Sequence, residues 1–297
     1  MNMNLPDSWS QEDVLVSHLA HELHRGRLGL FLGAGLSAFY GMPQWSELVN
    51  RLAARVGAPL MKPGDDPILK VGAIRAKYYA NRKAAFLADV REELYRGKVV
   101  DFDSIRQNDT LAAIGALVMS SKRGSASKVI SLNYDDLLEL YLEHHGFVTT
   151  SVWEDHHWAN NDDVTVYHPH GFLPLSDRPC SDDIVFATAE YYGIMQSDFW
   201  RPLLQTHLRT RTFIYIGLSG NDMHIQSLIS GIKNKHAIAK DRIAFHSVRF
   251  SLGGSGDEVG EMLREEGVFT HTIANYEELP RFLFKICQAA RLLRTQR

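Results

Sequence analysis

The 297-residue sequence is poor in features that define several protein classes. Cysteine occurs only at positions 180 and 287, which excludes a disulfide scaffold and a four-cysteine zinc site. Neither sign of charge dominates, because 32 Lys and Arg stand against 35 Asp and Glu, for a net charge of −3. No apolar run approaches the roughly 20 residues of a membrane-spanning helix, and the N-terminal residues lack the pattern of a signal peptide. We therefore expect a cytoplasmic protein without membrane attachment or direct nucleic-acid binding.

What the sequence contains is the composition of a globular protein. Hydrophobic residues make up 45% and charged residues 23%, which is enough apolar material for a sizeable core. Residues 67–97 and 109–120 are rich in strong helix formers and have few β-branched runs. We predict one domain over residues 1–297 that carries a helical insertion at about 46–127.

Short apolar strands alternate with helical segments outside that insertion. The first strand, Leu28–Leu32, follows a helix that opens at Ser10 and ends before Gly26. Further strands are expected at Lys128–Leu132, Phe147–Val152, Val164–Tyr167, Thr212–Leu218, Arg242–Val248 and Val268–Ile273. Helices are expected at 134–145, 188–209, 222–235, 257–266 and 276–293. This alternation predicts an α/β fold with a Rossmann-like, mostly parallel sheet that has helices on both faces.

A glycine-rich turn follows the first strand. Gly33, Ala34, Gly35 and Ser37 form a GAGxS pattern in which glycines allow close backbone approach and a helix start offers free N–H groups to a pyrophosphate. Alone the pattern is also compatible with an ordinary strand–helix turn. No GxxxxGK sequence is present, which disfavours a P-loop ATPase. The next turn, from Gly41 to Trp45, reads as a loop anchored by the tryptophan.

Polar residues follow three later strands, where an open α/β sheet places its ligands. Asn133 and Asp135 come after one strand, and the Asn carboxamide suits a ribose hydroxyl or a water, although either residue could instead cap a helix. His170 precedes a glycine after another strand and is a candidate general base. The third set is Gly217, Ser219 and Asp222, which could hold a ribose or cap a helix. The adjacent histidines at 144–145 and 156–157 are interpreted as surface residues.

In this order the motifs GAGxS, GxPxW, NYDxLL, HG and GxSxxD resemble the sirtuin-like (silent information regulator) superfamily. The resemblance spans about residues 28–230 and is greatest to the bacterial NADase branch. Deacylase sirtuins have an Arg shortly after the Gly-x-Pro turn, where this chain reads Pro43-Gln44-Trp45-Ser46, and they have four zinc cysteines. Both departures disfavour protein deacetylation and leave cleavage of NAD intact.

The resemblance implies a site and a substrate. It implies that NAD is the substrate, that no metal is needed, and that Asn133 and His170 are the catalytic pair. It further implies that Asp135 and Asp222 support them as polar residues. The dinucleotide is expected to contact the glycine turn on one side and the adenosine-side residues on the other, namely Gly33, Ala34, Gly35, Ser37, Gly217 and Ser219.

Relatives of this kind resemble effectors of anti-phage defence that deplete NAD when triggered. Such an activity requires regulation, and the chain looks too short for an additional sensor domain. The resemblance therefore implies regulation by assembly, either as a homo-oligomer or with a HerA-like ATPase partner. Two alternatives stay open: a sensor or scaffold that binds NAD or ADP-ribose without turnover, and the nuclease subunit of a HerA-type complex. For the latter, Asp162-Asp163 and Asp182-Asp183 are the acidic pairs available.

Overall fold

The computed structural model describes residues 9–98, 101–155, 162–218, 226, 247–252 and 258–293. Several sequence predictions lie outside these residues. They include the sites expected at Ser219 and Asp222, the histidines at 156–157, and all but Gln226 of the helix expected at 222–235. Within the described part of the chain, no helix combines the length and apolar character that crossing a bilayer requires.

A seven-stranded sheet forms the centre of the molecule, and each of its strands pairs in parallel with its neighbours. The spatial order is β3-β4-β2-β1-β5-β6-β7. This architecture confirms the predicted α/β fold with a Rossmann-like parallel sheet. The strand bounds are β1 Leu28–Leu32, β2 Lys128–Ser131, β3 Thr149–Val152, β4 Val164–Tyr167, β5 Thr212–Ile216, β6 Ser247–Leu252 and β7 Val268–Ile273.

Successive side chains of a strand point to opposite faces of the sheet, and both faces are buried here. In β1, Leu28, Leu30 and Leu32 belong to one apolar cluster, whereas Phe31 belongs to the cluster on the other face. The fully buried pattern of β1 and β5 explains why their sequences are apolar without alternation.

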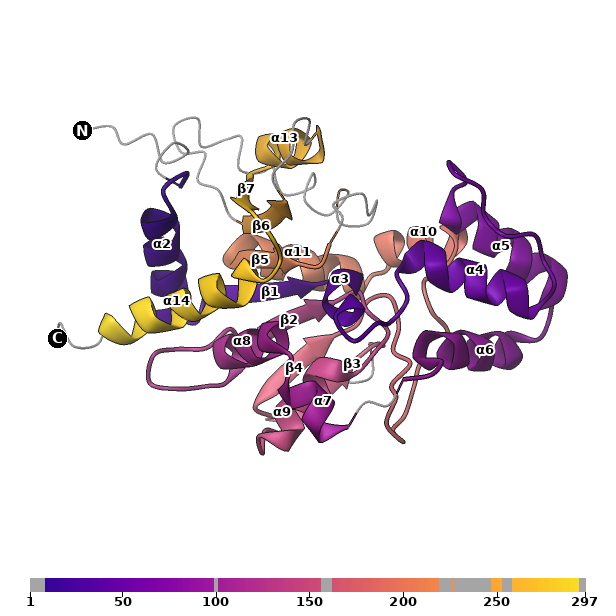
Figure 1. The fold of residues 1–297 in the computed structure, drawn as a ribbon, viewed down its shortest axis with the longest axis horizontal. Coiled ribbons are helices and arrows are strands. Elements are labelled where there is room, and N and C mark those ends of the chain that lie inside the picture. Colours follow the sequence, from indigo (N-terminus) through magenta and orange to yellow (C-terminus); the bar gives the residue numbers. More distant parts are fainter. Residues whose placement is uncertain are drawn as a thin grey trace.

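Helices cover the two faces (Figure 1). One apolar cluster joins the sheet to α2 Glu12–His24, α7 Phe102–Arg106, α8 Asp109–Val118, α9 Leu137–His144 and α14 Glu278–Leu292. The cluster on the opposite face draws on α11 Trp200–Thr210 and α13 Glu258–Glu265. Helix α14 packs against both α2 and α8, so the last helix of the described chain closes one side of the core.

Three further helices form a lobe beside the sheet, drawn at the right of Figure 1. They are α4 Trp45–Arg55, α5 Pro67–Tyr78 and α6 Lys83–Tyr95. The lobe has its own apolar cluster, in which Phe86 and Phe186 are fully buried. The helices predicted over about 46–127 therefore fall into two groups. Helices α4, α5 and α6 form the lobe, whereas α7 and α8 pack on the sheet. The single-domain assignment itself stays a prediction.

Three predicted elements differ from the structure. The helix expected over 188–209 is two helices, α10 Thr188–Gln196 and α11, because the Ser197 hydroxyl accepts a hydrogen bond from the Trp200 amide and starts a new helix. The helix expected from residue 134 begins at Leu137. The strand expected at Arg242–Val248 is described only from Ser247, as β6, which extends to Leu252 and so four residues beyond the expected end.

Candidate functional site

The glycine turn lies where the strand order of the sheet reverses. Strand β1 has β2 on one side and β5 on the other, so the carboxyl ends of β1 and β5 flank a topological switch point, where open α/β sheets bind ligands. Helix α3, Ala34–Ala38, begins directly after Gly33. A Cβ atom at Gly35 would lie 2.7 Å from the Cα of Gly217, whose own φ is +71°. These glycines therefore permit backbone-to-backbone packing between the two strand ends.

That packing uses two amides of the turn. Gly33 N–H donates to the carbonyl of Ile216 at 2.9 Å, and Gly35 N–H donates to the carbonyl of Gly217 at 2.9 Å. Among the described residues, no acceptor receives the Ala34 amide. Of the turn residues predicted to contact the pyrophosphate, Ala34 thus has the amide left to donate.

A hydrogen-bond chain joins the turn to the end of β2. Ser37 donates from Oγ to Oδ2 of Asp135 at 2.6 Å, and Asn133 donates from Nδ2 to the same Ser37 Oγ at 2.9 Å. All three side chains are buried. The structure thus brings together Ser37, Asn133 and Asp135, which lie about one hundred positions apart in the sequence. The side chain of Asn133 is directed to Ser37, so it does not act as the helix cap that the sequence left open.

The hydrogen bonds of this chain all run in one direction, which leaves Oδ1 of Asn133 for a ligand. The Asp135 carboxylate accepts, Ser37 relays, and the Asn133 amide group donates, so no described group donates to Oδ1 of Asn133. Burial raises the pKa of Asp135 to about 6, opposed by the Ser37 hydrogen bond, which favours the carboxylate. The ionised form of Asp135 therefore sets the direction of the hydrogen bonds that orient Asn133.

His170 lies on the loop after β4, the strand that neighbours β2. Its side chain is buried, and its ring is in T-shaped contact with the ring of Tyr191 at a centroid distance of 5.2 Å. The backbone carbonyl of His170 accepts a hydrogen bond from Val185 N–H at 2.8 Å, which fixes the loop. Burial lowers the pKa of His170 to about 3, so the imidazole is neutral near pH 7.

A second histidine, which the sequence reading did not assign, ties these elements together. The Nδ1 of His168 lies 3.0 Å from the carbonyl of Asn133, and its Nε2 lies 2.7 Å from Oε1 of Glu139. Both partners of the His168–Glu139 pair are buried. Burial opposes both charges, but the mutual attraction prevails and raises the pKa of His168 while it lowers that of Glu139. The pair anchors the backbone of Asn133 to β4 and α9.

Asp136 is a second anchor that sequence reasoning missed. Its carboxylate accepts hydrogen bonds from the amides of Leu175 at 2.8 Å and Ser176 at 3.3 Å, and Arg178 lies 3.6 Å away. The signal was present, because acids at 135, 136 and 139 cluster directly after a strand. The sequence could not show that only the first of them faces Ser37.

Other predicted features take structural roles. Trp45 packs edge-on against Phe186 with the ring centroids 4.5 Å apart, which confirms it as an anchor. His144 and His145 are exposed, as expected.

The acidic pairs considered for a nuclease have separate roles as well. Asp163 accepts the Val148 amide at 2.9 Å, and Asp183 forms ion pairs with Arg75 and Lys83 at 3.3 Å and 2.8 Å. Among the residues that the structure describes, no three His, Cys, Asp or Glu side chains converge as a metal-binding group.

Comparison with known proteins gives matches of three kinds, namely a protein family, curated relatives and a solved structure. Residues 127–253 match the family described as the SIR2-like domain, a range that contains Asn133, Asp135 and His170. Curated relatives include "NAD(+) hydrolase ThsA" of Acinetobacter baumannii, which is 25% identical over 226 residues, covering 75% of this chain and 42% of the relative. The ThsA proteins of Enterococcus faecium and Bacillus cereus are 24% and 21% identical and are covered over 43% and 44% of their lengths.

The chain therefore spans less than half the length of these curated relatives. A solved structure, "Structural Basis for the Mechanism and Regulation of Sir2 Enzymes", matches with a TM-score of 0.42 and 14% identity, over 94% of this chain and 98% of the other. The chain is thus similar to the SIR2-like family across residues 127–253, and this segment carries both residues of the predicted catalytic pair.

Proposed function

We propose that this chain hydrolyses the bond between nicotinamide and ribose in NAD⁺, which yields nicotinamide and ADP-ribose. The observation that carries the proposal is the buried Ser37–Asn133–Asp135 chain at the switch point of the sheet, with His170 at the end of the adjoining strand. The three ThsA relatives are named NAD(+) hydrolases, which supports the same reaction.

The chemistry requires positioning and charge stabilisation more than covalent help. The electron pair of the breaking C1′–N bond goes to the positively charged pyridinium ring, so nicotinamide leaves neutral without needing an acid. The ribose develops oxocarbenium character, which the nearby carboxylate of Asp135 stabilises. A water molecule then bonds to C1′ through its oxygen, and Oδ1 of Asn133 orients either this water or a ribose hydroxyl.

His170 is the proposed acceptor for the proton that this water loses. Because burial keeps the imidazole neutral, it enters the reaction uncharged at any pH well above 3. Its low pKa makes it a weak base in the empty site. The acceptor role therefore depends on a bound dinucleotide whose diphosphate raises that pKa toward the working range.

The test is to incubate the purified chain with NAD⁺ and to quantify nicotinamide and ADP-ribose, with and without EDTA. We expect equimolar products at a rate that EDTA does not change. His170→Ala and Asn133→Ala should each lower the rate by about 10²–10⁴-fold, the usual cost of losing a general acid or base, while the thermal melt shows a folded protein. Wild-type turnover in either variant would overturn the assignment.

The alternative is a sensor that binds NAD or ADP-ribose without turnover. Equilibrium binding of NAD⁺ with no nicotinamide released at any protein concentration would favour the sensor over the hydrolase. Release that EDTA abolishes would instead favour a metal-dependent reaction.

The proposed biological role follows from the reaction. Hydrolysis of NAD in the cytoplasm would deplete the cofactor, as expected for an effector of anti-phage defence. Such an effector must be held inactive until it is triggered. We propose that assembly provides this control, through homo-oligomers or a HerA-like ATPase partner.

A further inference from the structure

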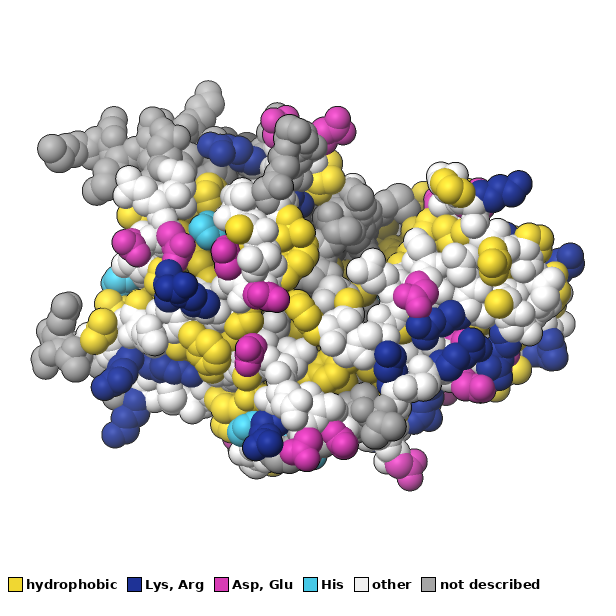
Figure 2. Space-filling view, in the orientation of Figure 1, with side chains coloured by type: hydrophobic (Ala, Val, Ile, Leu, Met, Phe, Trp, Pro, Cys, Tyr) yellow, Lys and Arg dark blue, Asp and Glu magenta, His cyan; other side chains and the backbone are white. Residues whose placement is uncertain are grey.

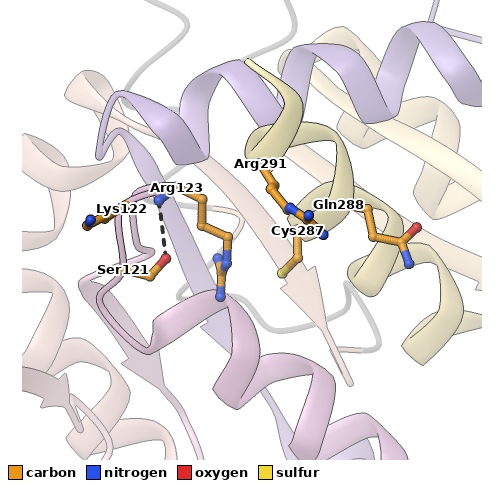
Figure 3. A pocket seen from close by; sticks show the side chains of 6 residues that line it. All are labelled: Ser121, Lys122, Arg123, Cys287, Gln288 and Arg291. Atoms are coloured by element: carbon orange, nitrogen blue, oxygen red, sulfur yellow. Dashed lines mark hydrogen bonds between the residues drawn. The ribbon is translucent and has the colours of Figure 1, made fainter. Parts of the chain in front are cut away.

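A cleft of about 500 Å³ lies far from the proposed site in the fold (Figure 3). It is bounded by the loop between α8 and β2 on one side and by α14 on the other. This loop approaches the amino end of β2, whereas the proposed site follows the carboxyl end of that strand. The volume falls within the range of small-molecule sites. The residues that line the cleft are Ser121, Lys122, Arg123, Cys287, Gln288 and Arg291.

The charge of this cleft is of one sign. Lys122, Arg123 and Arg291 are cationic, the other three lining residues are neutral, and no described carboxylate forms an ion pair with any of the three cations. Figure 2 shows dark blue side chains gathered near the loop after α8 and along α14. Like charges around one cleft repel each other, so an anion bound between them would relieve that repulsion.

One of these cations is partly desolvated. The Nη1 of Arg123 is buried and has no hydrogen-bond partner, although Nη2 of the same group donates to the carbonyl of Ala116. A buried charged donor without a partner costs free energy, and a bound anion would remove this cost. Figure 3 shows Arg123 extending from the loop toward α14, where Arg291 lies beside Cys287.

The loop holds Arg123 in a defined place. The Arg123 amide donates to Oγ of Ser121 at 3.2 Å, and the Gly124 amide donates to the carbonyl of Ser121 at 3.0 Å. Gly124 has a φ of +94°, and a Cβ atom there would lie 2.1 Å from the carbonyl oxygen of Leu23. Only glycine fits this turn, which is tied to α2 and so pre-organises the cationic side of the cleft.

We propose that this cleft binds a small diphosphate-bearing anion, which Arg123 and Arg291 hold from the loop and from α14. The planar guanidinium groups suit phosphate oxygens, and two of them match the two phosphoryl groups of a diphosphate. The stems of the lining side chains and the sulfur of Cys287 supply apolar surface beside the cations. The site is separate from the proposed NAD site and does not depend on it.

The two cysteines provide a direct test. Cys287 lines the cleft and is partly buried, whereas Cys180 is exposed elsewhere and serves as an internal control. The alkylation of each cysteine by neutral iodoacetamide would be followed by peptide mass spectrometry, with inorganic pyrophosphate, with ADP, and with KCl at equal ionic strength. Burial raises the pKa of the Cys287 thiol, and the Arg123 charge partly opposes this rise. A bound diphosphate covers Cys287 and neutralises that opposing charge, and both effects slow its alkylation.

We expect pyrophosphate or ADP to slow alkylation of Cys287 and not of Cys180. Stronger protection by ADP assigns the site to a nucleoside diphosphate, and equal protection assigns it to the diphosphate alone. Arg291→Gln, at an exposed position, and Arg123→Gln should each raise the half-protecting concentration by about tenfold, the effect of one charge-assisted hydrogen bond. Arg201→Gln, an exposed arginine on α11, should leave it unchanged.

Three results would overturn the proposal. They are the absence of protection at millimolar diphosphate, an equal effect of KCl, and protection that persists in both cleft variants. Because the readout is local to Cys287, binding of diphosphate at the NAD site does not produce it, and a failure of the proposed function leaves this test intact.

Discussion

At the scale of single residues, Asp135 combines a cost to the fold with a role in the proposed site. Burial raises its pKa from 3.8 to about 6, so above pH 6 the folded protein holds a carboxylate that the unfolded chain would ionise more easily. This rise in pKa corresponds to about 3 kcal/mol in the free energy of unfolding. The contribution of Asp135 to the free energy of unfolding is fully present below pH 3.8 and is lost as the pH rises through 6.

Asp135→Asn removes the buried charge. The change that it causes in the free energy of unfolding should therefore be more favourable at pH 8 than at pH 4, by up to about 3 kcal/mol. The same variant should lose NAD cleavage, since Ser37 and Asn133 are oriented by the carboxylate. Urea unfolding at the two pH values measures the first effect. Asp177→Asn, an exposed control, should show no such pH dependence, and an equal response of both variants would contradict the account.

His168 and Glu139 form the buried ion pair that holds the backbone of Asn133. The contribution of His168 is complete below pH 6.5 and is lost as the pH rises through its raised pKa. The contribution of Glu139 is present above pH 4.5 and is lost as the pH falls through its lowered pKa. The pair therefore stabilises the fold most in the window between these limits.

Removal of one buried partner leaves the other charge uncompensated, so Glu139→Gln should cost about 3–5 kcal/mol in that window. Glu143→Gln, on the same helix, breaks a partly exposed pair with Arg178 at 2.6 Å and should cost less than about 1 kcal/mol. Chemical denaturation across the pH range gives both values. Equal losses for the two variants would show that the buried pair contributes no more to stability than the partly exposed pair.

At the scale of elements, the close approach of α3 and β5 is the contact that shapes the switch point. Gly35→Ala places a methyl group 2.7 Å from the Cα of Gly217, so the two strand ends must separate, at a cost of about 1–3 kcal/mol and with weaker NAD binding. Gly193→Ala, in α10, meets no atom within 4 Å and should be neutral or stabilising. Melting temperatures and NAD titration compare the two, and a harmless Gly35→Ala would contradict the role of the contact.

The elements also show what the sequence could predict. Strands β1 and β4 have the predicted bounds, because each is a short, largely apolar segment bounded by polar residues or glycine. The break between α10 and α11 was missed, since Ser197 looks like any polar helix residue until its hydroxyl is seen to cap Trp200. Helix α9 starts late because the side chains of Asn133 and Asp135 contact Ser37 instead, a tertiary contact that no local pattern encodes.

The candidate site was likewise predictable only in part. The motif residues Ser37, Asn133 and Asp135 could be found from their places after strands, and the structure brings them together. The His168–Glu139 pair could not be found, because it joins β4 to α9 through burial and through the register of two neighbouring strands. Sequence patterns point to strand ends, but which side chains meet there depends on the packing.

At the scale of the whole molecule, the proposed control by assembly makes a quantitative prediction. If homo-oligomers are the active form, the specific rate of NAD cleavage should rise with protein concentration, in step with the mass measured by light scattering. A partner-dependent enzyme would instead stay inactive alone at every concentration and gain activity with the HerA-like ATPase. A monomer that is fully active at micromolar concentration would contradict regulation by assembly.

The central claim is that Asn133 and His170 face the same N-glycosidic bond. The most direct measurement is a crystal structure of the folded but inactive His170→Ala variant with NAD⁺ bound. The account predicts the nicotinamide ribose within hydrogen-bond reach of Asn133, about 3 Å, and beside the space vacated by the imidazole. A nicotinamide ribose bound away from both positions would contradict it.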